Sequence, residues 1–246
     1  MHTRTLVPNI LILAMILLVS VRLSAQTVED SILVDTGIEP NVVSNDDYRD
    51  PLIRFNRAMF AFNDVSYRYV LIPAARTYLH APAPLRIGVS NFFNNIKTPI
   101  PLVNHLLQLQ PREAGVDFVR FVVNSTVGIA GLFDPADAWM HLEREETGMS
   151  ETLIQYGTNY GAYLVLPLVG PSNLRDGSAL VVDSFLNPLA YILDNPESIV
   201  VRGFDNFQEF APSAAVYLEL REESEDLYIF MRNLHLQGIR RDAQYK

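Results

Sequence analysis

One segment of the sequence, REAGVDFVRFVVNSTVG at 112–128, limits the possible folds more than any other. At helical period, valines and phenylalanines cover nearly the whole circumference, and a single polar line of Asp117, Arg120 and Asn124 interrupts them. A helix that is apolar nearly all round lies in a large core or in lipid. Two interpretations follow. The segment is a central core helix whose arginine pairs with an acid, or it contacts hydrocarbon outside and lines a polar passage inside.

The rest of the sequence has the pattern of helices that are separated by prolines. Only YLVLPLV at 163–169 resembles a strand, and Pro167 restricts it to a sheet edge or an extended loop. We expect the first helix to run from Pro51 to about Tyr69 or Leu71, where Pro73 stops or kinks it. Further helices are expected over 84–98, 100–109, 112–128, 171–193, 197–220 and 222–237. The sequence therefore predicts an all-α domain with one extended loop that is flanked by glycine and proline.

The N-terminus resembles an export signal. An apolar run of 16 residues at 6–21 is followed by Leu23 and Ala25, which are spaced like the recognition residues of a signal peptidase. The run is shorter than the roughly 20 residues that cross a bilayer. We therefore expect 1–25 to be a signal peptide, with an uncleaved anchor as the alternative. Residues 26–49 are acidic and predict a disordered tether, and 50–246 form the helical domain.

Composition excludes several classes of function. The net charge of −9 argues against a nucleic-acid binder, which needs basic groups to neutralise phosphates. The absence of cysteine excludes disulfides, thiolate catalysis and thiolate metal sites. The five histidines form no HxxxH or HExxH pair, and the chain has no GxSxG elbow and no glycine-rich phosphate loop. We therefore expect no catalytic residues, no metal and no cofactor.

The segment FNRAMFAFND at 55–64 has aromatic residues on two faces of a helix. Phe55 begins one apolar stripe, and Asn56 and Asn63 lie seven residues apart on a second stripe. Such a helix suits a boundary between protein and lipid, with the asparagines forming hydrogen bonds between helices. Arg57 and Asp64, on a third stripe, are expected to pair with each other.

Four blocks of the sequence together resemble the MlaA family, which is also called VacJ. They are DPLIRFNRAMFAFN (50–63), NFFNNIKTP (91–99), RFVVNSTVGIAGLFDPA (120–136) and YLVLPLVGPSNLRD (163–176). The resemblance covers nearly the whole mature chain and implies a single ring-like domain of amphipathic helices around a central channel. It also implies a location at the periplasmic face of the Gram-negative outer membrane, in the inner leaflet, and no enzymatic activity. The motif residues of the first helix are Phe55, Asn56, Arg57, Phe60 and Asn63.

The resemblance further implies a role in lipid asymmetry. Members of the family remove mislocalised phospholipid from the outer leaflet through an amphipathic channel and pass it to a soluble periplasmic carrier of the MlaC type. They also bind trimeric porins. This sequence departs from the family in two places: it has no lipobox cysteine, and Ala162 stands where proline is usual. Membrane attachment must then come from the apolar surface or from an uncleaved N-terminus.

Two residue-level hypotheses follow. Asp117, Arg120 and Asn124 line the polar side of a lipid channel, and the 157–176 loop borders that channel and controls passage. The residues that mark this loop are Gly161, Tyr163, Leu166, Gly170 and Pro171. Two alternatives remain open: a scaffold that binds outer-membrane proteins without transporting lipid, and a lipid hydrolase, for which the sequence offers no nucleophile with a base in reach.

Overall fold

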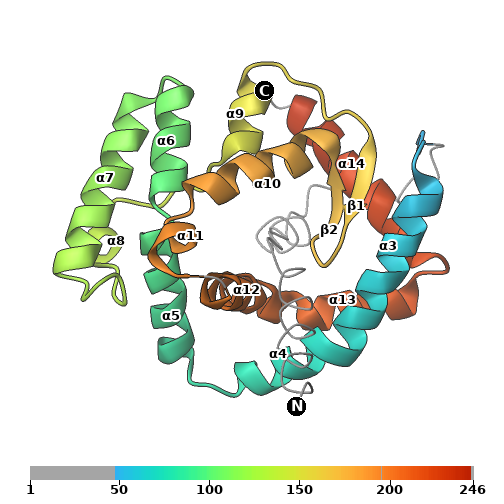
Figure 1. Cartoon of the computed structure of the whole chain (residues 1–246), viewed down its shortest axis with the longest axis horizontal. Coiled ribbons are helices and arrows are strands. Elements are labelled where there is room, and N and C mark those ends of the chain that lie inside the picture. The colour runs from blue at the N-terminus through green and yellow to red at the C-terminus, as the bar shows by residue number, and fades with distance from the viewer. Residues whose placement is uncertain (1–47, 195, 245–246) are drawn as a thin grey trace, which may run out of the picture.

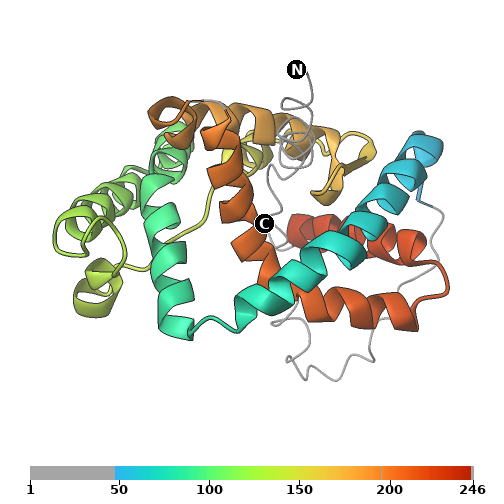
Figure 2. The same cartoon turned by 60° about the horizontal axis from the view of Figure 1, so that its bottom comes forward.

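The computed structural model describes residues 48–194 and 196–244 of the chain. Viewed down the shortest axis, the helices follow one another around the perimeter of the molecule, and α6, α7 and α8 form a group on the outer side of α5 (Figures 1 and 2). The first helices are α3 (Ile53–Ser66), α4 (Ile72–Leu79), α5 (Ala83–Ile96), α6 (Pro99–Leu107), α7 (Pro111–Thr126), α8 (Pro135–Met140) and α9 (Met149–Gln155). After a hairpin follow α10 (Leu174–Leu186), α11 (Leu189–Ile192), α12 (Glu197–Phe210), α13 (Ala214–Glu223) and α14 (Leu227–Gln244). The expected mostly helical domain is confirmed.

Prolines mark the starts of many helices. α4, α5, α6, α7 and α8 each carry proline in the first turn, where the missing N–H has no intrahelical partner to lose. The long helices expected over 171–193 and 197–220 are wrong in extent. Pro171 lies in a strand, Pro188 separates α10 from α11, and a short 3-10 turn at Ala211–Ser213 separates α12 from α13. The last helix begins at Leu227, five residues later than expected.

Pro73 does not stop the first helix. α3 continues through a π-helical segment, η1 (Tyr67–Leu71), directly into α4, and the three elements form one long rod (Figure 2). The N–H of Ile72 donates to the carbonyl of Tyr67, five residues back. A wider turn of this kind accommodates a proline, because the normal α-helical turn would place the ring against the carbonyl four residues earlier.

The extended loop is a two-stranded antiparallel hairpin. β1 (Tyr163–Leu166) pairs with β2 (Gly170–Asn173), with Tyr163 opposite Asn173 and Leu166 opposite Gly170. Two residues at this end of the hairpin lie in the left-handed region: Leu168 in the connecting turn, at φ 58°, and Gly170, the first residue of β2, at φ 92°. The hairpin lies between α3 on one side and α10 and α14 on the other.

Two clusters of buried side chains hold this arrangement. One joins η1 and α4 to the α12–α13 junction through Tyr67, Leu71, Phe210 and Tyr217. The other surrounds the hairpin and contains Tyr48, Tyr163, Val165, Tyr228 and Leu236. Tyr48 is therefore part of the folded domain, two residues before its expected start. The expected signal peptide, 1–25, and the tether up to residue 47 lie outside the described residues.

Candidate functional site

The apolar segment at 112–128 forms most of α7, and this helix has its polar residues inside and its apolar residues outside. Asp117, Arg120 and Asn124 are 4%, 7% and 7% exposed, whereas Phe118 and Val122 on the opposite side are 58% and 42% exposed. Soluble proteins normally show the reverse distribution. The interpretation of this segment as a central core helix is therefore wrong, although its arginine does pair with an acid, Asp134. The apolar side of the helix is exposed, and its polar side faces α5 and α6, with which it shares a pocket lining and a hydrogen bond.

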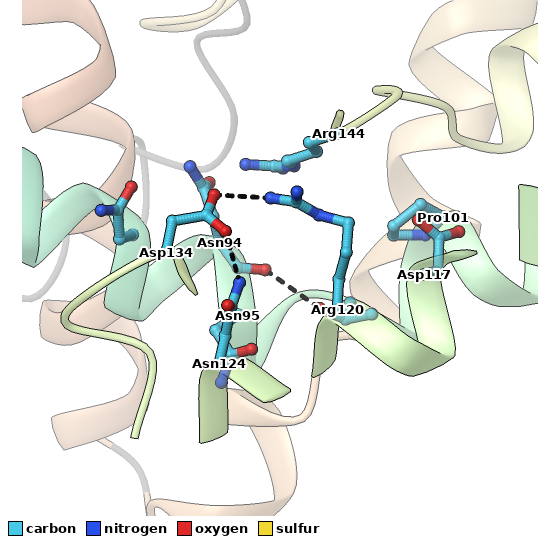
Figure 3. Close-up of a pocket in the computed structure, with 10 residues that line it drawn as sticks. Asn94, Asn95, Pro101, Asp117, Arg120, Asn124, Asp134 and Arg144 are labelled. Atoms are coloured by element: carbon cyan, nitrogen blue, oxygen red, sulfur yellow. Dashed lines mark hydrogen bonds and ion pairs between the residues drawn. The ribbon is translucent and has the colours of Figure 1, made fainter. Parts of the chain in front are cut away.

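The polar line of α7 borders a pocket of about 90 Å³ between α5 and α7 (Figure 3). A second polar line on α5 faces it, so amide and hydroxyl groups from two helices meet. The pocket lining consists of Asn91, Asn94, Asn95, Thr98, Pro101, Asp117, Arg120, Asn124, Asp134 and Arg144. The structure thus brings the three predicted residues of α7 to one polar cavity. That they line a lipid channel stays a prediction.

Asp134, just before α8, organises one end of the pocket. Its carboxylate lies 2.6 Å from Nη2 of Arg120 and accepts a hydrogen bond of 2.9 Å from the amide of Asn124. It also accepts from the backbone N–H of Asp137 as the cap of α8. Burial opposes its ionisation, but the bonds from Asn124, Asp137 and Arg120 together lower the pKa of Asp134. Asp134 was not singled out as a site residue from the sequence, although an aspartate directly before Pro135 is a typical helix-capping signal.

Asp117 pairs with a histidine that the sequence did not connect to it. Nδ1 of His105, on α6, lies 2.7 Å from Oδ2 of Asp117, and both side chains are almost fully buried. Burial raises the pKa of Asp117, and the hydrogen bond from His105 and the nearby guanidinium of Arg120 oppose this rise. The second ring nitrogen of His105, Nε2, is buried without a hydrogen-bond partner in the described part of the chain.

Asn56 of α3 binds the backbone of β1. Its Nδ2 donates to the carbonyl of Tyr163 at 3.1 Å, and its Oδ1 accepts from the N–H of Val165 at 2.9 Å. The side-chain amide therefore occupies the place of a neighbouring strand and pairs both backbone groups that the free edge of β1 would leave unsatisfied. The expectation that the asparagines join helix to helix is wrong, because this one joins a helix to a strand.

Asn63 repeats the same interaction at the other end of the hairpin. Its Nδ2 donates to the carbonyl of Leu166 at 2.8 Å, and its Oδ1 accepts from the N–H of Leu168 at 2.6 Å. Seven residues of helix rise about 10.5 Å. Three residues of strand span about 10 Å. The spacing of the two asparagines therefore matches the spacing of their targets, and the two form a clamp, the Asn56–Asn63 clamp, on the hairpin.

The two aromatic faces of α3 have different environments. Phe55 is 48% exposed, whereas Phe60 is half-buried and packs edge-on against Tyr228 of α14 with ring centroids 5.6 Å apart. One apolar face of the helix therefore contacts the protein, and the other faces outward, as the two-face pattern predicted.

Arg57 and Asp64, on the charged stripe of α3, do not pair with each other. Arg57 binds Asp226 at 2.8 Å, and Asp64 binds Arg221 at 2.9 Å and Arg68 at 3.2 Å. The expected pair of Arg57 with Asp64 is wrong, since residues seven apart on a helix are two turns from each other. Both side chains instead connect α3 to the C-terminal helices.

The predicted loop residues gather on the hairpin and its approach. Tyr163 is almost fully buried, and its hydroxyl has no partner in the described chain. Leu166 is half-buried at the end of β1, and Pro171 lies in β2 opposite Val165. Gly161 and Gly170 have φ values of 74° and 92°, in the left-handed region that glycine tolerates. The two glycines thus allow the backbone conformations that the hairpin and its approach require.

Two arrangements typical of enzyme sites, a metal-binding cluster and a histidine paired with a hydroxyl, do not occur among the described residues. In residues 48–194 and 196–244, no three His, Asp or Glu side chains gather as a metal site would require. Within the same ranges, no histidine hydrogen-bonds a serine or threonine hydroxyl, which a hydrolase of the serine type would need. Of the helices that the structure describes, none combines the length and apolarity that crossing a membrane demands.

Large apolar side chains are exposed over several neighbouring elements instead. Phe133 and Trp139, next to α7, are 62% and 71% exposed, and Phe185 and Tyr191 of α10 and α11 are 66% and 72% exposed. Soluble monomers rarely leave so much apolar surface uncovered. This surface therefore suits contact with lipid or with another protein.

Comparisons with known proteins agree with the sequence resemblance. The family model described as "MlaA lipoprotein" matches residues 48–242. A Haemophilus influenzae protein named "Intermembrane phospholipid transport system lipoprotein MlaA" is 33% identical over 77% of this chain and 77% of its own length. The Escherichia coli K12 protein of the same name is 34% identical over 88% and 86% of the two chains. A solved structure titled "Structural basis for maintenance of bacterial outer membrane lipid asymmetry" matches with TM-score 0.62 and 34% identity, over 78% of this chain and 97% of that one.

Proposed function

The chain belongs to the MlaA lipoprotein family, and we propose on this basis that it removes mislocalised phospholipid from the outer leaflet of the outer membrane. The lipid passes through an amphipathic route to a soluble periplasmic carrier, and the protein is held beside a porin trimer. Relatives named as components of a phospholipid transport system support the lipid and membrane parts of this proposal. Its direction, carrier and porin rest on the family resemblance of the sequence.

The inverted distribution of polar and apolar residues on α7 is the observation that carries the proposal. Phe118 and Phe121 face outward, while Asp117, Arg120 and Asn124 face a polar cavity. Moving a phospholipid requires no bond chemistry. It requires shelter for the acyl chains, because each CH₂ left in water costs about 0.8 kcal/mol, and polar partners for the headgroup. A ring of helices that are apolar outside and polar between elements supplies both.

The hairpin is the element that we propose to control passage. It is held to α3 by the Asn56–Asn63 clamp and to the rest of the protein by the buried Tyr163 and Val165. In the described residues the sheet has two strands, and a two-stranded hairpin is marginally stable alone. Its position therefore depends on these contacts, which makes it suitable as a border of the lipid route.

The exposed apolar surface also supports a mode of membrane attachment. The sequence contains no cysteine that could carry a lipid anchor. We propose that the outward faces of α7, α8, α10 and α11 hold the protein in the inner leaflet, on the periplasmic side, after export by the N-terminal signal. Apolar contact with hydrocarbon does not depend on salt, so attachment should persist in a high-salt wash.

The test is a deletion of the gene with complementation by point variants. Deletion should raise outer-leaflet phospholipid and sensitivity to detergent, and the wild-type gene should restore both. Asn124→Leu should restore them poorly, because it removes a polar group from the cavity and a partner from Asp134. Arg112→Leu, exposed at the start of α7, is the matched control. Deletion without any change in outer-leaflet phospholipid would contradict the proposal and would favour the scaffold.

A further inference from the structure

A second polar pocket lies among the end of α5, the start of α6, α10 and α12. Its volume is about 70 Å³. Charged and amide side chains form most of the wall, and Ile100 and Leu180 supply an apolar part. The polar residues of the lining are Lys97, Asp183, Ser184, Asn187, Arg202, Asp205, Asn206 and Glu209. This pocket is separate from the one between α5 and α7, and the two have no lining residue in common.

Each of the two long helices that border this pocket is amphipathic in an unusual way. On α12, Arg202, Asp205 and Glu209 are spaced i, i+3 and i+7 and face the pocket. On its other side, Val200 and Phe204 are 38% and 37% exposed. The charged and apolar surfaces of α12 therefore lie on opposite faces of the helix.

The helix opposite, α10, repeats this arrangement. Asp183 and Ser184 face the pocket, while Val181 and Phe185 on the flank are 58% and 66% exposed. The apolar part of the lining itself comes from Ile100 and Leu180, so the cavity combines charged groups with a small apolar wall.

The charges in the pocket indicate which headgroup it suits. The buried ammonium of Lys97 lies 2.8 Å from the carboxylate of Asp205 and 2.6 Å from that of Glu209. Its single positive charge neutralises one of these two carboxylates, which leaves one negative charge in excess. Arg202 donates from Nε to the carbonyl of Ser198, and within the described residues no acidic group pairs with its guanidinium. The pocket therefore offers a cationic group at Arg202 and, at a separate place, an excess negative charge at Asp205 and Glu209.

We propose that this pocket binds the headgroup of a zwitterionic phospholipid with a primary amine, a proposal that rests on the proposed lipid transport. The guanidinium of Arg202 binds the phosphate, and the ammonium binds near Glu209, whose Oε2 has no hydrogen-bond partner in the described chain. Two cationic and three anionic side chains leave a net charge of −1 in the pocket. An anionic headgroup would add a second uncompensated charge, so the pocket should disfavour it.

The test measures which lipids stay bound to the purified protein. The full-length chain is extracted in mild detergent from membranes that contain phosphatidylethanolamine and phosphatidylglycerol, and the retained lipids are quantified by mass spectrometry. The wild-type protein should be enriched in phosphatidylethanolamine relative to the membrane. Arg202→Gln should lower retention of both lipids by about tenfold, the loss of one charge-assisted hydrogen bond. Glu209→Gln should lower retention of phosphatidylethanolamine alone and so remove the enrichment.

Matched controls carry the same chemical changes at exposed sites, Arg112→Gln on α7 and Glu222→Gln on α13. Circular dichroism melting confirms that each variant is folded, and Lys97 keeps Asp205 as a partner in Glu209→Gln. If the wild-type protein retains phospholipid but Glu209→Gln leaves the lipid ratio unchanged, the headgroup assignment is wrong and the transport proposal stands. If the wild-type protein retains no phospholipid, both are wrong.

Discussion

Replacing Asn63 by leucine should release one end of the hairpin. The change keeps the branched shape and the number of heavy atoms of the side chain but removes both hydrogen bonds, so the carbonyl of Leu166 and the buried N–H of Leu168 lose their partners. A hydrogen bond contributes about 1 kcal/mol net, and a buried group left unpaired costs about 1–3 kcal/mol. We therefore expect the free energy of unfolding to fall by about 2–4 kcal/mol.

Amide hydrogen exchange followed by mass spectrometry can locate this loss. In Asn63→Leu, exchange of the Leu168 amide should accelerate by about a hundredfold, because each 1.4 kcal/mol corresponds to about a factor of ten. The amide of Val165, which Asn56 holds, should respond less. In Asn56→Leu, exchange should accelerate more at the amide of Val165 than at the amide of Leu168. The pair of variants thus compares two positions within one hairpin.

Arg54→Leu is the control for this experiment, because Arg54 is exposed on the same helix. If Asn63→Leu and Arg54→Leu gave the same exchange rate at Leu168, the hairpin would be held by its own side-chain packing. The reasoning that treats the Asn56–Asn63 clamp as its main support would then be refuted. Equal acceleration at both amides in either variant would also contradict it, because each asparagine binds a different end of the hairpin.

Three further predictions concern other contacts. Asp134→Asn should lower the free energy of unfolding by about 2–3 kcal/mol at pH 7. Because the pKa of Asp134 is lowered in the folded state, the difference between wild type and variant should shrink as the pH falls below about 4, and urea unfolding measures it. Gly131→Ala should lower the melting temperature, since φ is 89° and the added Cβ would lie 2.5 Å from Cβ of Asn95; an unchanged melting temperature would contradict this. Arg57→Ala should cost less than about 1 kcal/mol, because its ion pair is exposed, and a larger loss in urea unfolding would be unexpected.

The sequence was sufficient to predict which residues share one face of a helix. It was not sufficient to predict what that face contacts. The period of 112–128 correctly grouped Asp117, Arg120 and Asn124 on one side of a helix. It could not decide between a core and a lipid environment, because hydrocarbon and a protein core select the same side chains. Similarly, the asparagines of α3 were grouped on one stripe, but their partner was taken for a helix. The helix-to-strand contact joins residues 107 positions apart, and no local pattern encodes such a pairing.

Proline showed the limits of local rules most clearly. Pro73 predicted an interruption, yet the chain continues as one rod, because a π-helical segment absorbs the missing N–H and the bulk of the ring. Pro171 predicted a helix start and instead lies in β2, the second strand of a hairpin. In both cases tertiary packing, of η1 against α12–α13 and of the hairpin against α3, selected the rarer of two locally allowed conformations.

Trp139 offers a direct test of what covers the outward face of this protein. It is the single tryptophan of the chain, it is 71% exposed on α8, and α8 packs against α7. If this face lies in a leaflet, adding liposomes should shift its emission to the blue, and lipids brominated on the acyl chain should quench it. Phe118→Asp should weaken liposome binding by at least about tenfold, since burying one phenylalanine is worth about 1.5–3 kcal/mol. Emission that liposomes leave unchanged, with full access for an aqueous quencher, would show that this face does not enter lipid and would favour a protein partner.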